Sequence, residues 1–209
     1  MKKIEKIVNF FFEVGTAKNL LRNHHQVLKQ SNDTIASHSF RTAIIGLVLA
    51  DMEKANKEKV VQMCLLHDVA ELRTGDANFI NKFYRVENEE NAIKEQWDDI
   101  PGGKELVRLL SEYNARKTQE AIIAKEADNL DQIFLQREYF SENSYDLKKW
   151  HGHIAKNLKT ASGRKIAGLA MKTNPLKWLY DFSESKKKAN CENFNQKLMK
   201  NILLYKYKG

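Results

Sequence analysis

The stretch LLHDVAELRTGD, residues 65–76, joins an apolar run to an adjacent histidine and aspartate. The run predicts a helix whose end carries His67 and Asp68 to a buried point. Glu71 follows His67 by four residues, so both side chains are expected on one helical face. Imidazole and carboxylate groups hold divalent metals inside helical proteins. An adjacent His-Asp pair is common by chance, so its meaning depends on the rest of the chain.

Two residues far away in the sequence are candidates for the same site. His38 opens the most apolar helix of the chain, although a lone histidine there is more often hydrogen-bonded structure than a ligand. Asp128 lies among alanine and leucine in a helix predicted over 118–140, where an unpaired carboxylate would be very costly. Asp131, one turn further on, could be the buried carboxylate instead, or could form a surface ion pair. Spacing alone favours Asp128 only modestly.

Together these side chains predict the centre of a metal-dependent hydrolase. His38, His67, Asp68 and Asp128 form a mixed nitrogen–oxygen set that suits one divalent transition metal (Co, Mn, Fe, Ni or Zn) and suits calcium poorly. Such a metal acidifies a bound water and neutralises charge on a phosphoryl oxygen. Glu71 is a candidate to orient or deprotonate that water, and its alternative is a surface glutamate at a helix end.

The remainder of the chain predicts an all-α, single-domain bundle. Its 209 residues include only 2 prolines and 9 glycines, which disfavours a sheet-rich fold with many tight turns. Helices are expected at about 1–15, 37–53, 57–72, 87–99, 104–113, 118–140 and 162–172. The segment TAIIGLVLADM, residues 42–52, is apolar nearly all round, which predicts a helix buried in the middle of the bundle. Residues 77–85 are predicted to be irregular.

Cysteine content and hydropathy indicate a cytoplasmic protein without a membrane segment. Cys64 and Cys191 are too few for a disulfide framework, and a buried free thiol suits a reducing compartment. The longest apolar run, at 43–50, is far too short to cross a bilayer.

The formal charge of +8 is concentrated in the last third of the chain. Residues 141–209 carry 15 Lys/Arg against 5 Asp/Glu, whereas residues 1–140 carry 20 against 22. A basic surface of this kind can bind nucleic acid. A solvated lysine-rich face is the more common meaning of such a composition, so a nucleic-acid partner is not expected.

Three segments carry a resemblance to a known family. The runs IASHSFRTAIIGLVLA (35–50), CLLHDVAELRTGD (64–76) and AKEADNLDQIFLQREYF (124–140) resemble the HD-domain phosphohydrolases. They are most similar to the 5'-deoxynucleotidase, YfbR-like branch of that family. MKTNPLKWLYDF at 171–182 resembles the closing segment of these relatives, so the similarity covers roughly residues 5–182.

The resemblance implies an all-helical HD-domain bundle, one divalent metal and a homodimer. It places the metal on His38, His67, Asp68 and Asp128, and its Ala-Asp pair selects Asp128 over Asp131. It implies hydrolysis of a deoxynucleoside 5'-monophosphate to deoxynucleoside and phosphate. Residues 1–183 are expected to form the HD domain, with 184–209 as a basic tail or extra helix of the same unit.

The resemblance also assigns catalytic and substrate-binding residues. Glu71 and Asp76 would be catalytic, with Asp76 beside the sugar, where a carboxylate on a tight turn excludes a 2'-hydroxyl. Ala77, Asn78 and Phe79 would line the nucleotide. The chain departs from the family before Arg22-Asn23, where the usual Arg-Trp pair is replaced by Ala17-Lys18. Lys18 could supply charge to the substrate but not a bidentate fork.

Other functions remain as alternatives. The chain could instead carry out another HD phosphohydrolase reaction and cleave a triphosphate, a signalling nucleotide or a modified nucleotide. Those substrates require extra basic residues near the metal. Arg41 and Arg73 are the candidates, which is too few to favour a polyphosphate. A nucleic-acid-binding protein with a vestigial metal site is a further alternative. Arg41 and Lys125 could each meet a phosphate or form a salt bridge, so neither is assigned to the site.

Overall fold

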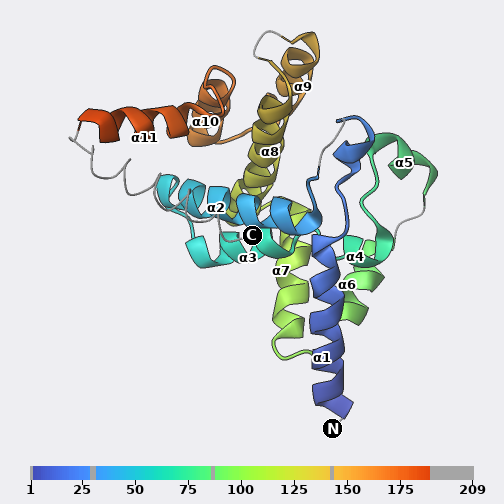
Figure 1. Ribbon diagram of the computed structural model, residues 1–209. Coiled ribbons are helices and arrows are strands. Elements are labelled where there is room, and N and C mark those ends of the chain that lie inside the picture. The colour runs from blue at the N-terminus through green and yellow to red at the C-terminus, as the bar shows by residue number, and fades with distance from the viewer. Residues whose placement is uncertain (1, 29–31, 86–87, 142–143, 189–209) are drawn as a thin grey trace, which may run out of the picture. The chain divides into compact units, whose positions relative to one another are not determined.

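The chain is all-α in the computed structural model, which describes residues 2–188 except 29–31, 86–87 and 142–143 (Figure 1). Over these residues the backbone is helical or irregular, with one isolated bridge between Leu21 and Thr34 and no strand. The predicted all-α class is therefore confirmed. The chain divides into two compact units, Met1–Met171 and Lys172–Gly209. This division does not test the predicted boundary between the HD domain and the basic tail at residue 183, and that boundary stays a prediction.

The first unit contains most of the helices. In chain order they are α1 (Lys2–Gly15), η1 (Thr16–Lys18), η2 (Asn23–Gln26), α2 (Ile35–Met52), α3 (Lys57–Leu66), α4 (Glu71–Thr74), α5 (Phe79–Tyr84), α6 (Glu89–Trp97), α7 (Gly103–Ala115), α8 (Gln119–Tyr139), α9 (Tyr145–Ala155) and α10 (Ala161–Ala170). Two of them differ from expectation. α5 lies where an irregular segment was predicted, and α9 was not predicted.

α2, α3 and α8 pack on one another and form the centre of this unit (Figure 1). Small side chains permit the close approach: a Cβ added at Gly46 would lie 2.5 Å from Cys64 Sγ, 3.1 Å from Val60 Cγ1 and 3.6 Å from the Cβ of Ala127. Around this contact the core side chains are fully enclosed, among them Leu49, Val60, Met63, Ile123, Leu130 and Ile133. The predicted buried free thiol at Cys64 is observed, and Cys191 lies outside the described residues.

Polar caps fix where the central helices begin. The Thr34 side chain accepts from the Ser37 backbone N–H, and the Ser37 side chain accepts from the Thr34 backbone N–H, which is a capping box. Asn56 and Thr118 cap α3 and α8 with a single bond each: their side chains accept from the backbone N–H groups of Lys59 and Ala121. His38 therefore lies in the first turn of α2, one turn after its cap.

The helix predicted over 57–72 is interrupted. α3 ends at Leu66, residues 67–70 form turns, and α4 begins at Glu71. At this break His67 Nδ1 donates to the Cys64 carbonyl over 2.8 Å. In a continuous helix that carbonyl would accept from the backbone N–H of Asp68, so the side chain competes with the helical bond. His67 and Asp68 thus stand at a helix end, as predicted, but Glu71 belongs to a separate helix.

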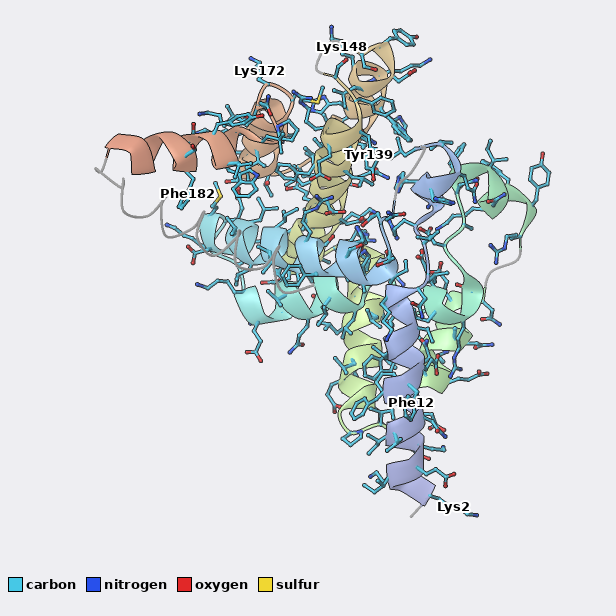
Figure 2. The ribbon with its side chains drawn as sticks, in the orientation of Figure 1. Lys2, Phe12, Tyr139, Lys148, Lys172 and Phe182 are labelled. Atoms are coloured by element: carbon cyan, nitrogen blue, oxygen red, sulfur yellow. The ribbon has the colours of Figure 1, made fainter. Side chains whose placement is uncertain are left out.

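α2 is not buried all round, which corrects the expectation for residues 42–52. One face, with Ala43, Gly46, Leu49 and Ala50, is enclosed. The opposite face exposes five large apolar side chains: Phe40, Ile44, Leu47, Val48 and Met52. α1 likewise exposes Phe12 (Figure 2). In the part of the chain that the structure describes, this face of α2 stays exposed, and an apolar helix surface of this kind can accept a second protein surface.

The second unit is described only from Lys172 to Lys188. It contains α11 (Lys177–Lys188), preceded by a turn in which Asn174 Oδ1 accepts from the Leu176 backbone N–H. The predicted basic tail or extra helix at 184–209 lies almost entirely outside the described residues. Among the described helices, none has the length and apolarity that crossing a bilayer requires.

Gly46→Ala should lower the free energy of unfolding by roughly 1–3 kcal/mol, because the new methyl group overlaps Cys64 Sγ. Urea unfolding measures the change. Adding Cys64→Ala should recover part of the loss, since the overlapping sulfur is then absent. Gly168→Ala is the matched control: nothing lies within 4 Å of a Cβ at this helical glycine, so it should stabilise the protein by about 0.5–1 kcal/mol. Equal effects at both glycines would contradict the close packing at Gly46.

Candidate metal centre

Four side chains from three parts of the first unit converge on one point. His38 comes from α2, His67 and Asp68 follow α3, and Asp128 lies in α8. The Nε2 atoms of the two histidines are 3.2 Å apart. Asp68 Oδ2 lies 3.5 Å from His38 Nε2 and 3.3 Å from His67 Nε2. Asp128 Oδ1 lies 3.4 Å and 3.9 Å from the same two atoms. The structure therefore brings together the four residues that the sequence nominated as ligands.

Hydrogen bonds fix which nitrogen each imidazole presents to the cluster. His67 Nδ1 donates to the Cys64 carbonyl, and His38 Nδ1 donates to Asp131 Oδ2 over 2.6 Å. Carbonyl and carboxylate oxygens only accept, so Nδ1 carries a proton in both rings, and Nε2 is the atom that each ring can offer to a metal. The donor atoms of His38, His67 and Asp128 all lie within 4.8 Å of one another, and Asp68 Oδ2 lies 3.5 Å and 3.3 Å from the two Nε2 atoms. A mixed nitrogen–oxygen set of this kind fits a divalent transition metal.

The cluster is strongly negative and requires positive charge. Burial lowers the pKa of His38, but hydrogen bonds to Asp128 and Asp131 outweigh it and raise that pKa to about 10. Burial opposes ionisation of Asp68, but the charges of His67 and Arg22 outweigh it and lower its pKa below the usual value. Without a cation the cluster thus draws a proton onto an imidazole. A metal bound at the same atoms would supply the charge and displace that proton.

Asp131 supports His38 from the side away from the cluster, whereas the sequence left it as either a rival buried carboxylate or a partner in a surface ion pair. Its side chain is 1% exposed. Besides the His38 contact, it accepts from Arg41 Nε, and Arg41 Nη1 lies 2.6 Å from Glu138 Oε1. Arg41 is therefore engaged in the salt bridges that its sequence position allowed. Lys125, the other unassigned cation, pairs with Asp128 Oδ2 over 2.6 Å. The signal for Asp131 was its i+3 spacing from Asp128 on one helix.

Arg22 is a site residue that sequence reasoning did not assign. Its side chain is buried, and Nη1 lies 2.5 Å from Asp68 Oδ2, 3.3 Å from Asp76 Oδ2 and 3.4 Å from Glu71 Oε2. Burial opposes the charge, but the carboxylates of Asp68, Asp76 and Glu71 outweigh it and raise the pKa of Arg22 above its usual value. The one available signal was the Arg22-Asn23 pair that the resemblance marked, without a role.

Glu71 and Asp76 lie beside this arginine. Burial, reinforced by Asp68 and Asp76, raises the pKa of Glu71 to about 9. The Asp76 side chain is 3% exposed. Its oxygens accept from the backbone N–H of Asn23 over 2.8 Å and from Asn23 Nδ2 over 2.6 Å. Both carboxylates therefore belong to the same buried polar network as Asp68.

The remaining predicted substrate residues lie at different depths. Ala77 is buried, and the Asn78 side chain both caps α5 and donates to Gln26 Oε1 over 2.5 Å. Phe79 is 78% exposed and packs edge-to-face on Phe83, with ring centroids 5.1 Å apart. Lys18 is exposed at the end of η1. Lys18 and Phe79 thus lie outside the buried cluster.

Comparison with known proteins gives consistent matches. The HD domain family matches residues 14–167. The 5'-deoxynucleotidase HDDC2 of Dictyostelium discoideum is 32% identical over 148 residues, which are 63% of this chain and 76% of that protein. The 5'-deoxynucleotidase HDDC2 of Danio rerio is 29% identical over 143 residues, covering 65% and 70%. The crystal structure of the PH0347 protein from Pyrococcus horikoshii OT3 superposes with a TM-score of 0.62 at 27% identity, over 82% of this chain and 98% of that one.

Asp131→Asn should weaken the binding of Mn²⁺ or Co²⁺ by about 10- to 100-fold, because His38 loses the carboxylate that fixes its tautomer. Isothermal titration calorimetry measures the affinity. Glu138→Gln is the control, since it removes the other carboxylate of Arg41 without touching His38, and it should leave the affinity unchanged. Wild-type affinity in Asp131→Asn would refute the orienting role of this residue.

Proposed function

The chain belongs to the HD-domain phosphohydrolase family, and we propose that it hydrolyses deoxynucleoside 5'-monophosphates to deoxynucleosides and phosphate. The observation that carries the proposal is the convergence of His38, His67, Asp68 and Asp128, whose donor atoms suit one divalent metal (Co, Mn, Fe, Ni or Zn). The names of the relatives support the substrate class.

The metal, when bound, supplies an acidified water and neutralises charge on the phosphoryl group. Glu71 would accept the proton of that water, because it lies in the same polar network as Asp68. In the metal-free protein its pKa, raised to about 9 by burial and by Asp68 and Asp76, keeps it protonated at neutral pH. A divalent charge at the cluster offsets those carboxylates and favours ionised Glu71, the form that a general base requires.

Asp76 would select the sugar. Asn23 holds both of its oxygens, so the carboxylate is fixed in one orientation. Each oxygen retains accepting capacity, and one sugar hydroxyl could donate to it. A rigid acceptor on the Thr74–Asp76 turn leaves little freedom to accommodate an added 2'-hydroxyl. Ala77, Asn78 and Phe79 would follow along the nucleotide, and exposed Lys18 would approach the phosphate from the surface.

The charge pairing favours a monophosphate over a triphosphate. Arg73 Nε lies 2.6 Å from Glu13 Oε1, and Arg73 Nη1 lies 3.2 Å from Glu95 Oε2. Arg41 is paired with Asp131 and Glu138. Two arginines that could have met a longer phosphate chain are thus already neutralised.

The cytoplasmic location and the homodimer stay predictions. The exposed apolar face of α2 is a surface on which a second copy would find apolar side chains.

Purified chain loaded with Mn²⁺ or Co²⁺ should release phosphate from deoxynucleoside 5'-monophosphates, and EDTA should abolish the release, because the metal activates the water. A phosphate-release assay over a panel of deoxy- and ribonucleoside mono- and triphosphates tests this. Ribonucleoside monophosphates should react more slowly if Asp76 excludes the 2'-hydroxyl. Release from triphosphates without release from any deoxynucleoside monophosphate would overturn the proposed substrate.

Glu71→Gln should reduce kcat by about 100-fold or more while metal binding persists, since the amide cannot accept the proton of water. Asp68→Ala should lose both metal binding and activity, because it removes a proposed ligand. Metal content by mass spectrometry and steady-state kinetics separate the two outcomes. Unchanged turnover in Glu71→Gln would exclude Glu71 as the group that handles water.

A further inference from the structure

Arg116, which follows α7, has two features that each cost free energy: a left-handed backbone and a buried nitrogen without a hydrogen-bond partner among the described residues. Its backbone has φ 54° and ψ 28°, the left-handed region that glycine adopts at lower cost and that helices commonly use at this position. Its Nη1 atom is buried and, within the described part of the chain, has no hydrogen-bond partner. A residue that keeps two unfavourable features at one position is expected to serve a site.

The guanidinium is the outer end of a continuous stack that leads to the metal centre. Arg116 Cζ lies 3.4 Å from the centroid of the Tyr113 ring, a cation–π contact. Tyr113 is 3% exposed, and its ring centroid lies 5.3 Å from that of His67. The His67 ring in turn lies 5.2 Å from the ring of His38. One ring, that of Tyr113, therefore lies between the Arg116 guanidinium and the His67 imidazole.

The two histidines differ in how firmly they are held, which explains why His67 needs this support. His38 donates to a buried carboxylate, Asp131, which Arg41 holds from the other side. His67 donates to a neutral carbonyl of its own helix end. A charge-assisted bond orients a ring more strongly than a neutral one. The His67 ring also packs against the Tyr113 ring, with the two planes tilted by 52°, so the position of Tyr113 limits the orientation of His67.

We propose that Arg116 is a positioning residue for the metal centre: its guanidinium holds Tyr113 against His67 and so fixes the imidazole that presents Nε2 to the cation. The proposal rests on the metal centre of the proposed function and is independent of which nucleotide is cleaved. Partners that orient a metal-binding histidine from outside the ligand set typically change metal affinity by 10- to 100-fold.

Arg116→Gly tests the proposal because glycine suits the left-handed backbone while removing the stack. The midpoint of urea unfolding of the metal-free protein should stay unchanged or rise. The affinity for Co²⁺, measured by calorimetry, should fall about 10-fold, and the visible absorption of the Co²⁺-loaded protein should change. Arg116→Lys, which keeps the charge without the planar group, should also weaken Co²⁺ binding.

Lys54→Gly is the matched control. Lys54 also has a left-handed backbone, with φ 57°, is exposed, and follows the far end of α2 from His38. It should gain the same relief of backbone strain and keep wild-type Co²⁺ affinity. Unchanged Co²⁺ affinity in Arg116→Gly, or a fall in its unfolding midpoint, would overturn the positioning role and leave the metal centre standing. A wild-type chain that binds no Co²⁺ would instead remove the metal centre, and this proposal with it.

Discussion

Concentrated negative charge at the meeting point of α2, α3 and α8 is the constraint on which the rest of this structure depends. Five carboxylates gather there, on Asp68, Glu71, Asp76, Asp128 and Asp131. The cations that face them are Arg22, Arg41 and Lys125. Uncompensated, such charge would cost more than the fold can supply. In the metal-free protein, protonation of Glu71 and of His38 reduces this charge, since both pKa values lie above neutral pH. A divalent cation between the imidazoles would take over that role from the proton on His38.

The fold delivers these groups by close packing and by caps that set each helix in register. Gly46, Cys64 and Ala127 let three backbones approach closely, so that side chains one or two turns away reach a common point. Thr34 caps α2 one turn before His38, and His67 donates to the Cys64 carbonyl just after α3 ends at Leu66. A helix end directs consecutive residues to different sides of the turn. That is why adjacent His67 and Asp68 can both face one cation.

Periodicity and residue type were sufficient to predict the all-α class and to nominate His38, His67 and Asp68. They left Asp128 and Asp131 as alternatives, because both carboxylates lie on the same apolar helix, and the family resemblance was needed to select Asp128. They could not predict Arg22 as the partner of Asp68, Glu71 and Asp76, since an ion pair between distant segments leaves no mark on local spacing. The predicted continuous helix through His67 was wrong for a different reason. The His67 side chain donates to the Cys64 carbonyl, and helix propensity does not account for such competition between a side chain and the backbone. The exposed face of α2 was missed because uniform apolarity does not reveal which side has a partner.

The groups at the cluster are held by different kinds of support. Asp76 is fixed by the Asn23 backbone and side chain, His38 by a carboxylate, and His67 by a carbonyl and a ring. Because the supports are also part of the core, ordering the metal site and ordering the fold are one process. Metal binding to the folded chain would therefore stabilise it by mass action. Of the two imidazoles, His67 has the weaker hydrogen-bonded support, because its Nδ1 donates to a neutral carbonyl of its own helix end, whereas His38 donates to a carboxylate.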